Sequence, residues 1–193
     1  MITFRVLART LAILLFILMP IFALAAVAQW QIIPNESSLT FTATQNNAPV
    51  TGQFKTFSGD IAFDPAQLAA SHVNIAVDTN SISSSYNEMS DTLKSADWFN
   101  VKLFPQAVFK ASSFKKLSDK TYQADGTLTI RDKTMPLTLK FDLTEYSPTQ
   151  LALTGTSSLK RTDFGIGQGE WAKDDVVKDE VQIKFSLTAK PRP

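Results

Sequence analysis

The feature that most constrains this chain is an alternation of apolar and polar residues with a period of two. Every second residue is apolar over residues 135–144 and again over residues 181–190. Shorter stretches with the same pattern occupy residues 72–78 and 39–42. Successive side chains of a β-strand point to opposite faces, so this pattern predicts strands with one apolar face and one solvated face.

Further strands are predicted at residues 50–63, 107–117, 121–131 and 151–160, with turn-forming sequences between them. Connections this short favour antiparallel pairing of neighbouring strands. About eight strands, each with a single solvated face, predict a closed β-barrel or a β-sandwich, and closure removes exposed strand edges. The predicted fold class is therefore all-β.

One segment, residues 84–96, lacks the alternation. Its apolar residues Met89 and Leu93 stand four positions apart, a spacing that predicts a short helix with a narrow apolar stripe. Trp98 and Phe99 follow at once. We expect the helix to dock on the barrel through these two rings.

The first 28 residues differ in composition from the rest, with 23 hydrophobic residues and only Arg5 and Arg9 as charges. The basic start, the apolar run from Leu11 and the small residues at 26–28 predict a cleaved secretory signal, followed by a domain at residues 29–193. An uncleaved inner-membrane anchor is the alternative, because residues 11–28 reach the roughly 18-residue spanning length. Either way the arginines favour export of the remainder to the periplasm.

The composition excludes several classes of function. Without cysteine there is no disulfide, thiolate zinc site, thiol nucleophile or lipid-modified cysteine. The formal net charge of +1 offers no basic footprint for nucleic acid. The single histidine, His72, lies on the polar side of its predicted strand, which favours a solvated residue over a catalytic relay and excludes a histidine-rich metal site. No cofactor or metal is predicted, and the oligomeric state is left open.

Two local clusters have ordinary interpretations. The acidic residues within 174–180 are interrupted by lysines and lack a calcium-loop pattern, so we expect a solvated loop. Three glycines fall within residues 165–169, without the helix and lysine of a phosphate loop. They predict a flexible loop or a close approach of the backbone to a neighbour. Trp171 beside them either lines a pocket or plugs the barrel end.

After residue 28 the chain keeps 11 of its 14 phenylalanines and all three tryptophans. The interior of a small barrel is either filled by such side chains or leaves room for one ligand. The sequence pattern does not choose between a packed barrel and one with a cavity.

Five short motifs resemble the YceI-like proteins, which are exported lipocalin-like barrels that bind polyisoprenoids. The motifs follow one another in family order and span about Trp30 to Ala189. They are GQFKTFSG with IAFDP (residues 52–59 and 61–65), DTNSI with DTLKSADWF (78–82 and 91–99), FP with AVF (104–105 and 107–109), GTLTIR with MPL (126–131 and 135–137), and RTDFGIG (161–167).

The resemblance implies an antiparallel lipocalin-like β-barrel of about eight strands around a long apolar pocket, with one short helix near its mouth. It implies non-enzymatic binding or carriage of an isoprenoid-tailed molecule, such as a quinone or a polyprenyl lipid. Strand parity and the resemblance together give the expected ligand-binding residues: Phe41, Phe54, Phe63, Trp98, Phe99, Phe109, Ile130, Leu139, Phe141, Phe164, Trp171 and Phe185.

The chain departs from the family pattern at two places. Many members carry a histidine near the end of the first strand, where this chain has Thr44, Gln45 and Asn46. The common Arg-Gly turn is Arg131-Asp132 here. Trp98 and the GQGEW sequence resemble a branch that also occurs joined to cytochrome b561-type membrane proteins, which implies a quinone ligand or a membrane redox partner.

Two alternative functions stay open at this stage. One is an enzyme acting on such a lipid, for which the candidate residues are Asp91, Asp97, Arg161, Asp163 and Glu170; no convergent set of nucleophile, acid and base is visible among them. The other is an interaction module for a membrane redox protein, with a packed barrel and residues 165–171 as the contact surface.

Overall fold

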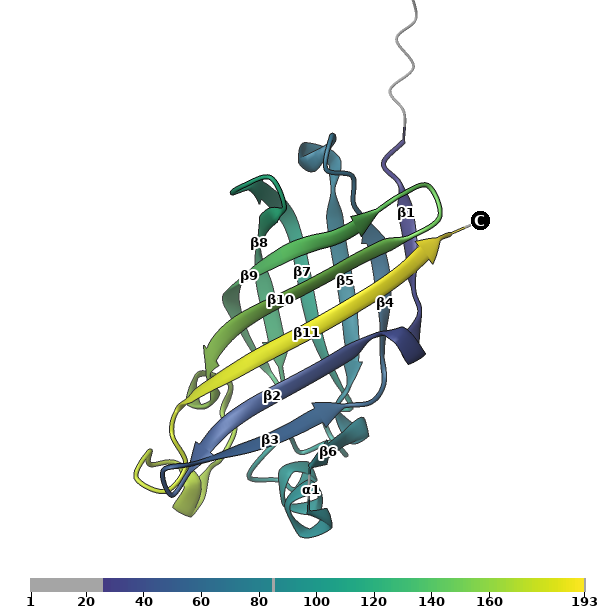
Figure 1. The fold of residues 1–193 in the computed structure, drawn as a ribbon. Coiled ribbons are helices and arrows are strands. Elements are labelled where there is room, and N and C mark those ends of the chain that lie inside the picture. Colours follow the sequence, from purple (N-terminus) through teal and green to yellow (C-terminus); the bar gives the residue numbers. More distant parts are fainter. Residues whose placement is uncertain (1–25, 85, 193) are drawn as a thin grey trace, which may run out of the picture.

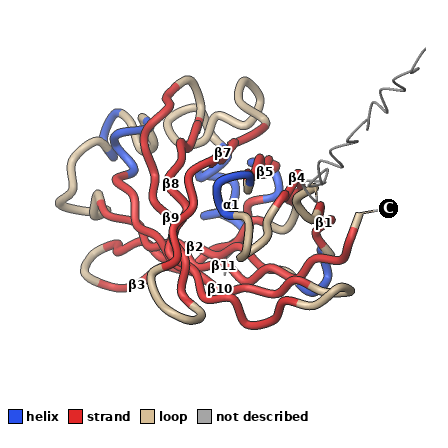
Figure 2. The backbone as a smooth tube through the Cα atoms, turned by 90° about the horizontal axis from the view of Figure 1, so that it is seen from above, coloured by secondary structure: helices blue, strands red, loops and turns tan. Residues whose placement is uncertain are grey.

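The computed structural model describes residues 26–84 and 86–192, and the predicted signal lies outside this part up to residue 25. A single antiparallel sheet wraps around into a closed barrel (Figures 1 and 2). Its strands are β1 (Gln29–Ile32), β2 (Ser38–Gln45), β3 (Ala48–Phe54), β4 (Phe57–Ala62), β5 (His72–Asp78), β6 (Ile82–Ser84), β7 (Gln106–Lys116), β8 (Thr121–Ile130), β9 (Lys133–Tyr146), β10 (Leu151–Lys160) and β11 (Glu180–Pro191).

Three strands of the barrel are bent, and each consists of two of the eleven segments. The eleven segments therefore form eight strands around the barrel. β1 and β2 form one such strand, β3 and β4 a second, and β5 and β6 a third. The last strand closes the ring, because one half of β11 pairs with β1 and the other half with β2. The predicted all-β class and the eight-stranded antiparallel barrel are confirmed, and the sandwich alternative is wrong.

The single strand expected at residues 50–63 is one of the bent strands. It is interrupted at Lys55 and Thr56, between β3 and β4. The backbone there bonds across to the neighbouring bent strand, since Lys55 N–H donates to Ser81 C=O and Asp78 N–H donates to Thr56 C=O. The bend therefore changes the direction of the strand while the backbone groups stay paired, which is the requirement for a buried wall.

A serine hydroxyl bridges the corresponding bend between β1 and β2, where the 3₁₀ turn η1 (Pro34–Glu36) interrupts the ladder. Ser37 Oγ accepts a hydrogen bond from the backbone N–H of Thr188 at 3.0 Å and donates to Ile33 C=O at 2.8 Å. The side chain thus replaces a strand partner that the bend has removed.

The barrel has two chemically different ends. We call one the packed end: Phe63 lies at its centre, in edge contact with Tyr122 and Phe141 at 5.7 and 5.8 Å between ring centroids. Trp30 covers Phe63 and donates its indole N–H to the Phe63 carbonyl at 2.9 Å. These aromatic contacts lie at the end of the barrel where β1 begins and β11 ends (Figure 1).

We call the other the helix end. It carries α1 (Asn87–Lys94), within the span predicted to be helical, together with residues 95–105 and the 3₁₀ turns η4 (Arg161–Phe164) and η5 (Gly169–Trp171) (Figure 1). Leu93 is buried, as are the rings of Trp98 and Phe99 that follow the helix. Over the described part of the chain, no helix is long and apolar enough to cross a membrane.

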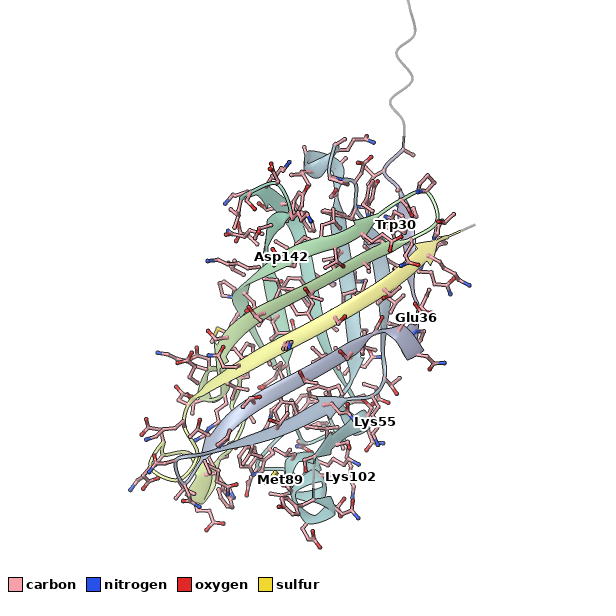
Figure 3. The ribbon with its side chains drawn as sticks, viewed as in Figure 1. Trp30, Glu36, Lys55, Met89, Lys102 and Asp142 are labelled. Atoms are coloured by element: carbon pink, nitrogen blue, oxygen red, sulfur yellow. The ribbon has the colours of Figure 1, made fainter. Side chains whose placement is uncertain are left out.

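Charged side chains occupy the outer surface, as the alternation predicts. Figure 3 shows Glu36, Lys55, Lys102 and Asp142 pointing away from the barrel, and all four are exposed. Only two ion pairs join described residues, Lys115 with Asp125 and Arg192 with Asp60, and both are solvent-accessible. Such pairs contribute little to stability, so closure and apolar burial hold the fold.

Replacing Ser37 with alanine leaves the Thr188 N–H without its acceptor at the bend. We expect the free energy of unfolding to fall by about 1–2 kcal/mol, the usual effect of an unpaired, partly buried donor. Urea denaturation measures this loss. Ser58→Ala on the exposed face of β4 is the matched control, and an equal loss in both variants would contradict a bridging role for Ser37.

Candidate binding cavity

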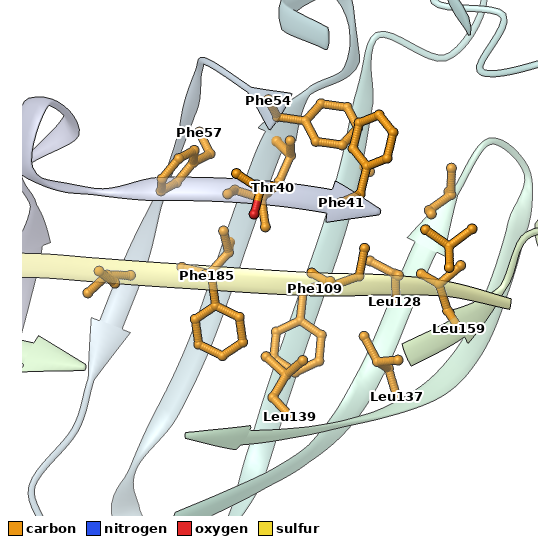
Figure 4. A pocket seen from close by; sticks show the side chains of 18 of the residues that line it. Thr40, Phe41, Phe54, Phe57, Phe109, Leu128, Leu137, Leu139, Leu159 and Phe185 are labelled. Carbon is orange, nitrogen blue, oxygen red and sulfur yellow. The ribbon is translucent and has the colours of Figure 1, made fainter. Parts of the chain in front are cut away.

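The inward-facing side chains of the strands leave a cavity of ≈ 250 Å³ inside the barrel (Figure 4). The burial of β11 is consistent with this cavity. Val181, Ile183, Phe185 and Leu187 point inward, yet they are only half-buried because part of their surface faces the cavity. The volume is just below the ~300–1,000 Å³ typical of small-molecule sites. It is suited to a slender ligand.

The wall of the cavity is almost wholly hydrocarbon. Only four of its lining residues are polar: Ser38, Thr40, Ser186 and Arg161. The first three alternate along their strands with inward-facing residues, and Thr40 Oγ1 donates to Lys184 C=O at 3.2 Å. The side chains of Phe109, Leu139 and Phe185 converge on the space in Figure 4. The cavity can therefore hold an apolar group but offers few partners to a polar one.

Ten of the twelve residues expected at the ligand site line this cavity. They come from six strands, from Phe63 just after β4 and from the segment after α1: Phe41, Phe54, Phe63, Trp98, Phe99, Phe109, Ile130, Leu139, Phe141 and Phe185. Whether they bind a ligand stays a prediction. The remaining two, Phe164 and Trp171, do not line the cavity.

Phe164 lies instead in a surface hollow between β9 and β10. The ladder between these strands ends at Thr156 and Lys140, and beyond this pair the strands diverge. Pro136 stands in the stretch of β9 that pairs with β8 but not with β10. Phe164 is buried there and fills the space between the diverging strands.

Trp171 backs the cavity wall from outside. Its ring lies 5.7 Å from that of Trp98, which does line the cavity. Of the two roles open from the sequence, lining the cavity therefore does not apply to Trp171, and plugging the barrel end stays a prediction. Strand parity does not extend to either misplaced aromatic, because both belong to 3₁₀ turns.

Arg161 lines the cavity, and only 2% of its surface is exposed. The sequence named it as a candidate catalytic residue but did not predict its burial. Its guanidinium donates to five backbone carbonyl groups, three of them within 2.9 Å. These carbonyls belong to Ile166, Gly167, Lys173, Val177 and Lys178. The side chain thus gathers the whole segment between β10 and β11 around one cation.

Burial lowers the pKa of Arg161, and the nearby carboxylates of Asp179 and Asp174 oppose that shift. The guanidinium still stays charged, since arginine titrates far above neutral pH. Gly167 packs directly on it: a Cβ there would collide with Arg161 Nη1. Gly167 therefore provides a close approach, which was one of the two roles predicted for the glycine cluster, whereas a Cβ on Gly169 would meet no atom within 4 Å.

Arg131 ties the helix side of this end to the glycine loop. Its Nη1 donates to the carbonyls of Trp98 at 2.6 Å and Gly165 at 2.8 Å. The Asp97 carbonyl accepts from the N–H groups of Gly167 and Gln168, both at 2.8 Å. Hydrogen bonds to main-chain carbonyls, rather than side-chain ion pairs, fasten the helix end.

The candidate catalytic residues are not brought together. Asp91, Asp97, Asp163 and Glu170 are exposed, and none lines the cavity. The only candidate at the cavity, Arg161, already uses its donors on carbonyl groups. His72 is exposed, and within residues 26–84 and 86–192 no cluster of three potential metal ligands occurs.

Comparison with known proteins identifies the family. The sequence profile of the YceI-like domain matches residues 30–189. The chain belongs to the YceI-like family. A UPF0312 protein of Shewanella baltica is 30% identical over 152 residues, which cover 74% of this chain and 80% of the relative. The resemblance drawn from the five motifs is confirmed.

Solved structures of similar proteins share the barrel. BcnA of Burkholderia cenocepacia superposes with a TM-score of 0.77 at 32% identity, covering 81% of this chain and 98% of BcnA. A domain from Saccharophagus degradans, described as polyisoprenoid-binding and implicated in plant cell wall breakdown, gives a TM-score of 0.69. It is 14% identical over 86% of this chain and 99% of its own length, and this likeness concerns the fold alone.

Replacing Arg161 with methionine keeps the bulk of the side chain but leaves five carbonyl groups without their donor. We expect the free energy of unfolding to fall by at least about 3 kcal/mol, since three of the five bonds are buried and each unpaired buried group costs about 1–3 kcal/mol. Urea denaturation followed by tryptophan fluorescence measures it. Lys160→Met, at the exposed neighbouring position, is the control, and an unaffected Arg161→Met variant would show that the cation does not organise this end.

Proposed function

We propose that this protein binds a single isoprenoid-tailed lipid or quinone in the barrel cavity and carries it without chemical change. The observation that supports this most directly is the cavity wall, which consists of aliphatic and aromatic side chains from strands all around the barrel. A branched hydrocarbon tail is the ligand class that such a wall recognises.

The affinity would come from the tail. Removing apolar surface from water contributes about 25 cal/mol per Å², so a long tail needs few polar contacts. The one charged group at the cavity, Arg161, is saturated by main-chain carbonyls and has no donor to spare for a head group. The wall therefore discriminates by the shape and length of the hydrocarbon more than by its polar end.

The family relationship supports the same ligand class. The Saccharophagus degradans domain that carries the polyisoprenoid-binding description has the same barrel. Quinones are one group within that class, and a membrane redox protein of cytochrome b561 type is the partner that the sequence resemblance implies. An interaction module with a packed barrel is less well supported, because the interior holds a cavity.

We further propose that the carrier works in the periplasm, exported by residues 1–28 as a cleaved signal. Fractionation of the producing bacterium, followed by intact-mass measurement, tests this. We expect periplasmic protein with the mass of residues 29–193, beginning at Gln29. Full-length protein in the inner-membrane fraction would show the uncleaved anchor instead.

Native mass spectrometry of the purified protein with added farnesol tests the binding proposal. We expect the mass to increase by one farnesol molecule. Leu139→Trp should weaken uptake at least tenfold, because the larger ring occupies the cavity that Leu139 lines. A wild-type protein that takes up no prenol would overturn the proposal.

Two controls accompany this measurement. Lys140→Trp places the same ring at the next, outward-facing position of β9 and should leave farnesol uptake unchanged. Circular dichroism of both variants verifies that the barrel is retained. Organic extraction of the wild-type protein then identifies the lipid that accompanies it from the cell.

A further inference from the structure

The four glycines within strands all face the inside of the barrel. Each is the cross-strand partner of an inward-pointing apolar residue: Gly52 of Phe41, Gly59 of Ile75, Gly126 of Leu137, and Gly155 of Phe185. A glycine in the middle of a strand is destabilising, because its backbone loses more entropy on folding and it has no side chain to pack. Glycine would be required at these positions if another group occupied the space that a side chain would take.

At two of the four, an aromatic ring occupies that space. A Cβ on Gly52 would come within 2.7 Å of Phe41 Cε1, and a Cβ on Gly155 within 2.8 Å of Phe185 Cε2. Both would lie closer still to the Cζ atom of the ring. The two rings therefore rest on their glycines, and a side chain at either glycine would displace its ring. A Cβ would also meet a backbone carbonyl oxygen, that of Lys140 at 2.5 Å from Gly155 and that of Ser83 at 2.9 Å from Gly52, so the test needs a glycine with a carbonyl contact but no ring as its control.

The two pairs stand at different places along the cavity. Phe41 contacts Phe54 at 5.8 Å between ring centroids, and Phe54 in turn contacts Phe99 at 5.6 Å, toward the helix end. Gly155 has Phe185 on one side and Phe141, from the packed end, on the other. Figure 4 shows Phe41 beside Phe54 and Phe185 apart from them, nearer Leu139.

We propose that the Phe41–Gly52 and Phe185–Gly155 pairs set the bore of the cavity and thereby the length of the isoprenoid tail it accepts. This inference rests on the proposed function and specifies the ligand further. The glycines are selectivity residues that touch no ligand, and they act through the rings that rest on them. Long tails need both rings against the wall, whereas short tails fit within one part of the cavity.

The test compares farnesol, a short prenol, with solanesol, a long one, by native mass spectrometry. In Gly155→Ala we expect solanesol uptake to fall at least fivefold relative to farnesol. In the double variant Gly155→Ala/Phe185→Ala the ring is gone, and we expect the solanesol-to-farnesol ratio to return to the wild-type value. A folded single variant with an unchanged ratio, or a folded double variant that does not recover, overturns the inference.

Gly126→Ala separates this effect from strain in the sheet. A Cβ at Gly126 would collide with the Lys110 carbonyl oxygen and come within 2.8 Å of Ala111 Cβ, and none of its three nearest atoms belongs to an aromatic ring. We expect its chain-length ratio to match wild type. If Gly155→Ala does not fold, Gly52→Ala with and without Phe41→Ala decides the same question. Wild-type protein that takes up neither prenol contradicts the proposed function itself, whereas binding without a change of ratio contradicts only this inference.

Discussion

Closure of the backbone hydrogen-bond ring is the constraint on which the rest of this structure depends. The wall around an apolar cavity is stable only if most of its peptide groups are paired within the wall, since a buried, unpaired N–H or C=O costs about 1–3 kcal/mol. The β9–β10 ladder is the exception, because it ends at Thr156 and Lys140. β11 meets this condition by pairing with β1 along one half and with β2 along the other. Ser37 completes the ring where the main chain cannot, through its bond to Thr188. The side chains are then free to shape a cavity instead of filling it.

The same constraint explains how the ends differ. The packed end closes with rings, centred on Phe63 and covered by Trp30. The helix end consists of 3₁₀ turns and loops, whose carbonyl groups have no ladder partners, and two arginines supply the donors. A guanidinium suits this task, because it presents five N–H groups in a fixed plane. Arg161 and Arg131 therefore do for the loops what neighbouring strands do for the wall.

The period of two was enough to predict the strands and to narrow the fold to a barrel or a sandwich, because parity assigns a face to each residue of a strand. Parity placed Phe141 and Phe185 on the apolar face, and the family resemblance was needed to predict that this face lines a cavity. It fails for Phe164 and Trp171, which lie in 3₁₀ turns where parity assigns no face. The strand break at Lys55 was not predicted, because it depends on the curvature of the barrel and the hydropathy pattern continues through it. The burial of Arg161 could not be predicted from the sequence. Its partners are main-chain carbonyl groups, which every residue type has, so no partner residue marks it.

The unlike fastening of the two ends has a thermal consequence. Contacts among rings at the packed end depend on the hydrophobic effect, which weakens on cooling. The carbonyl–arginine bonds of the helix end are polar and do not share this temperature dependence. Cooling should therefore make the packed end the more mobile of the two, and warming should make the helix end the more mobile. The two ends of the barrel should therefore lose order in different parts of the temperature range.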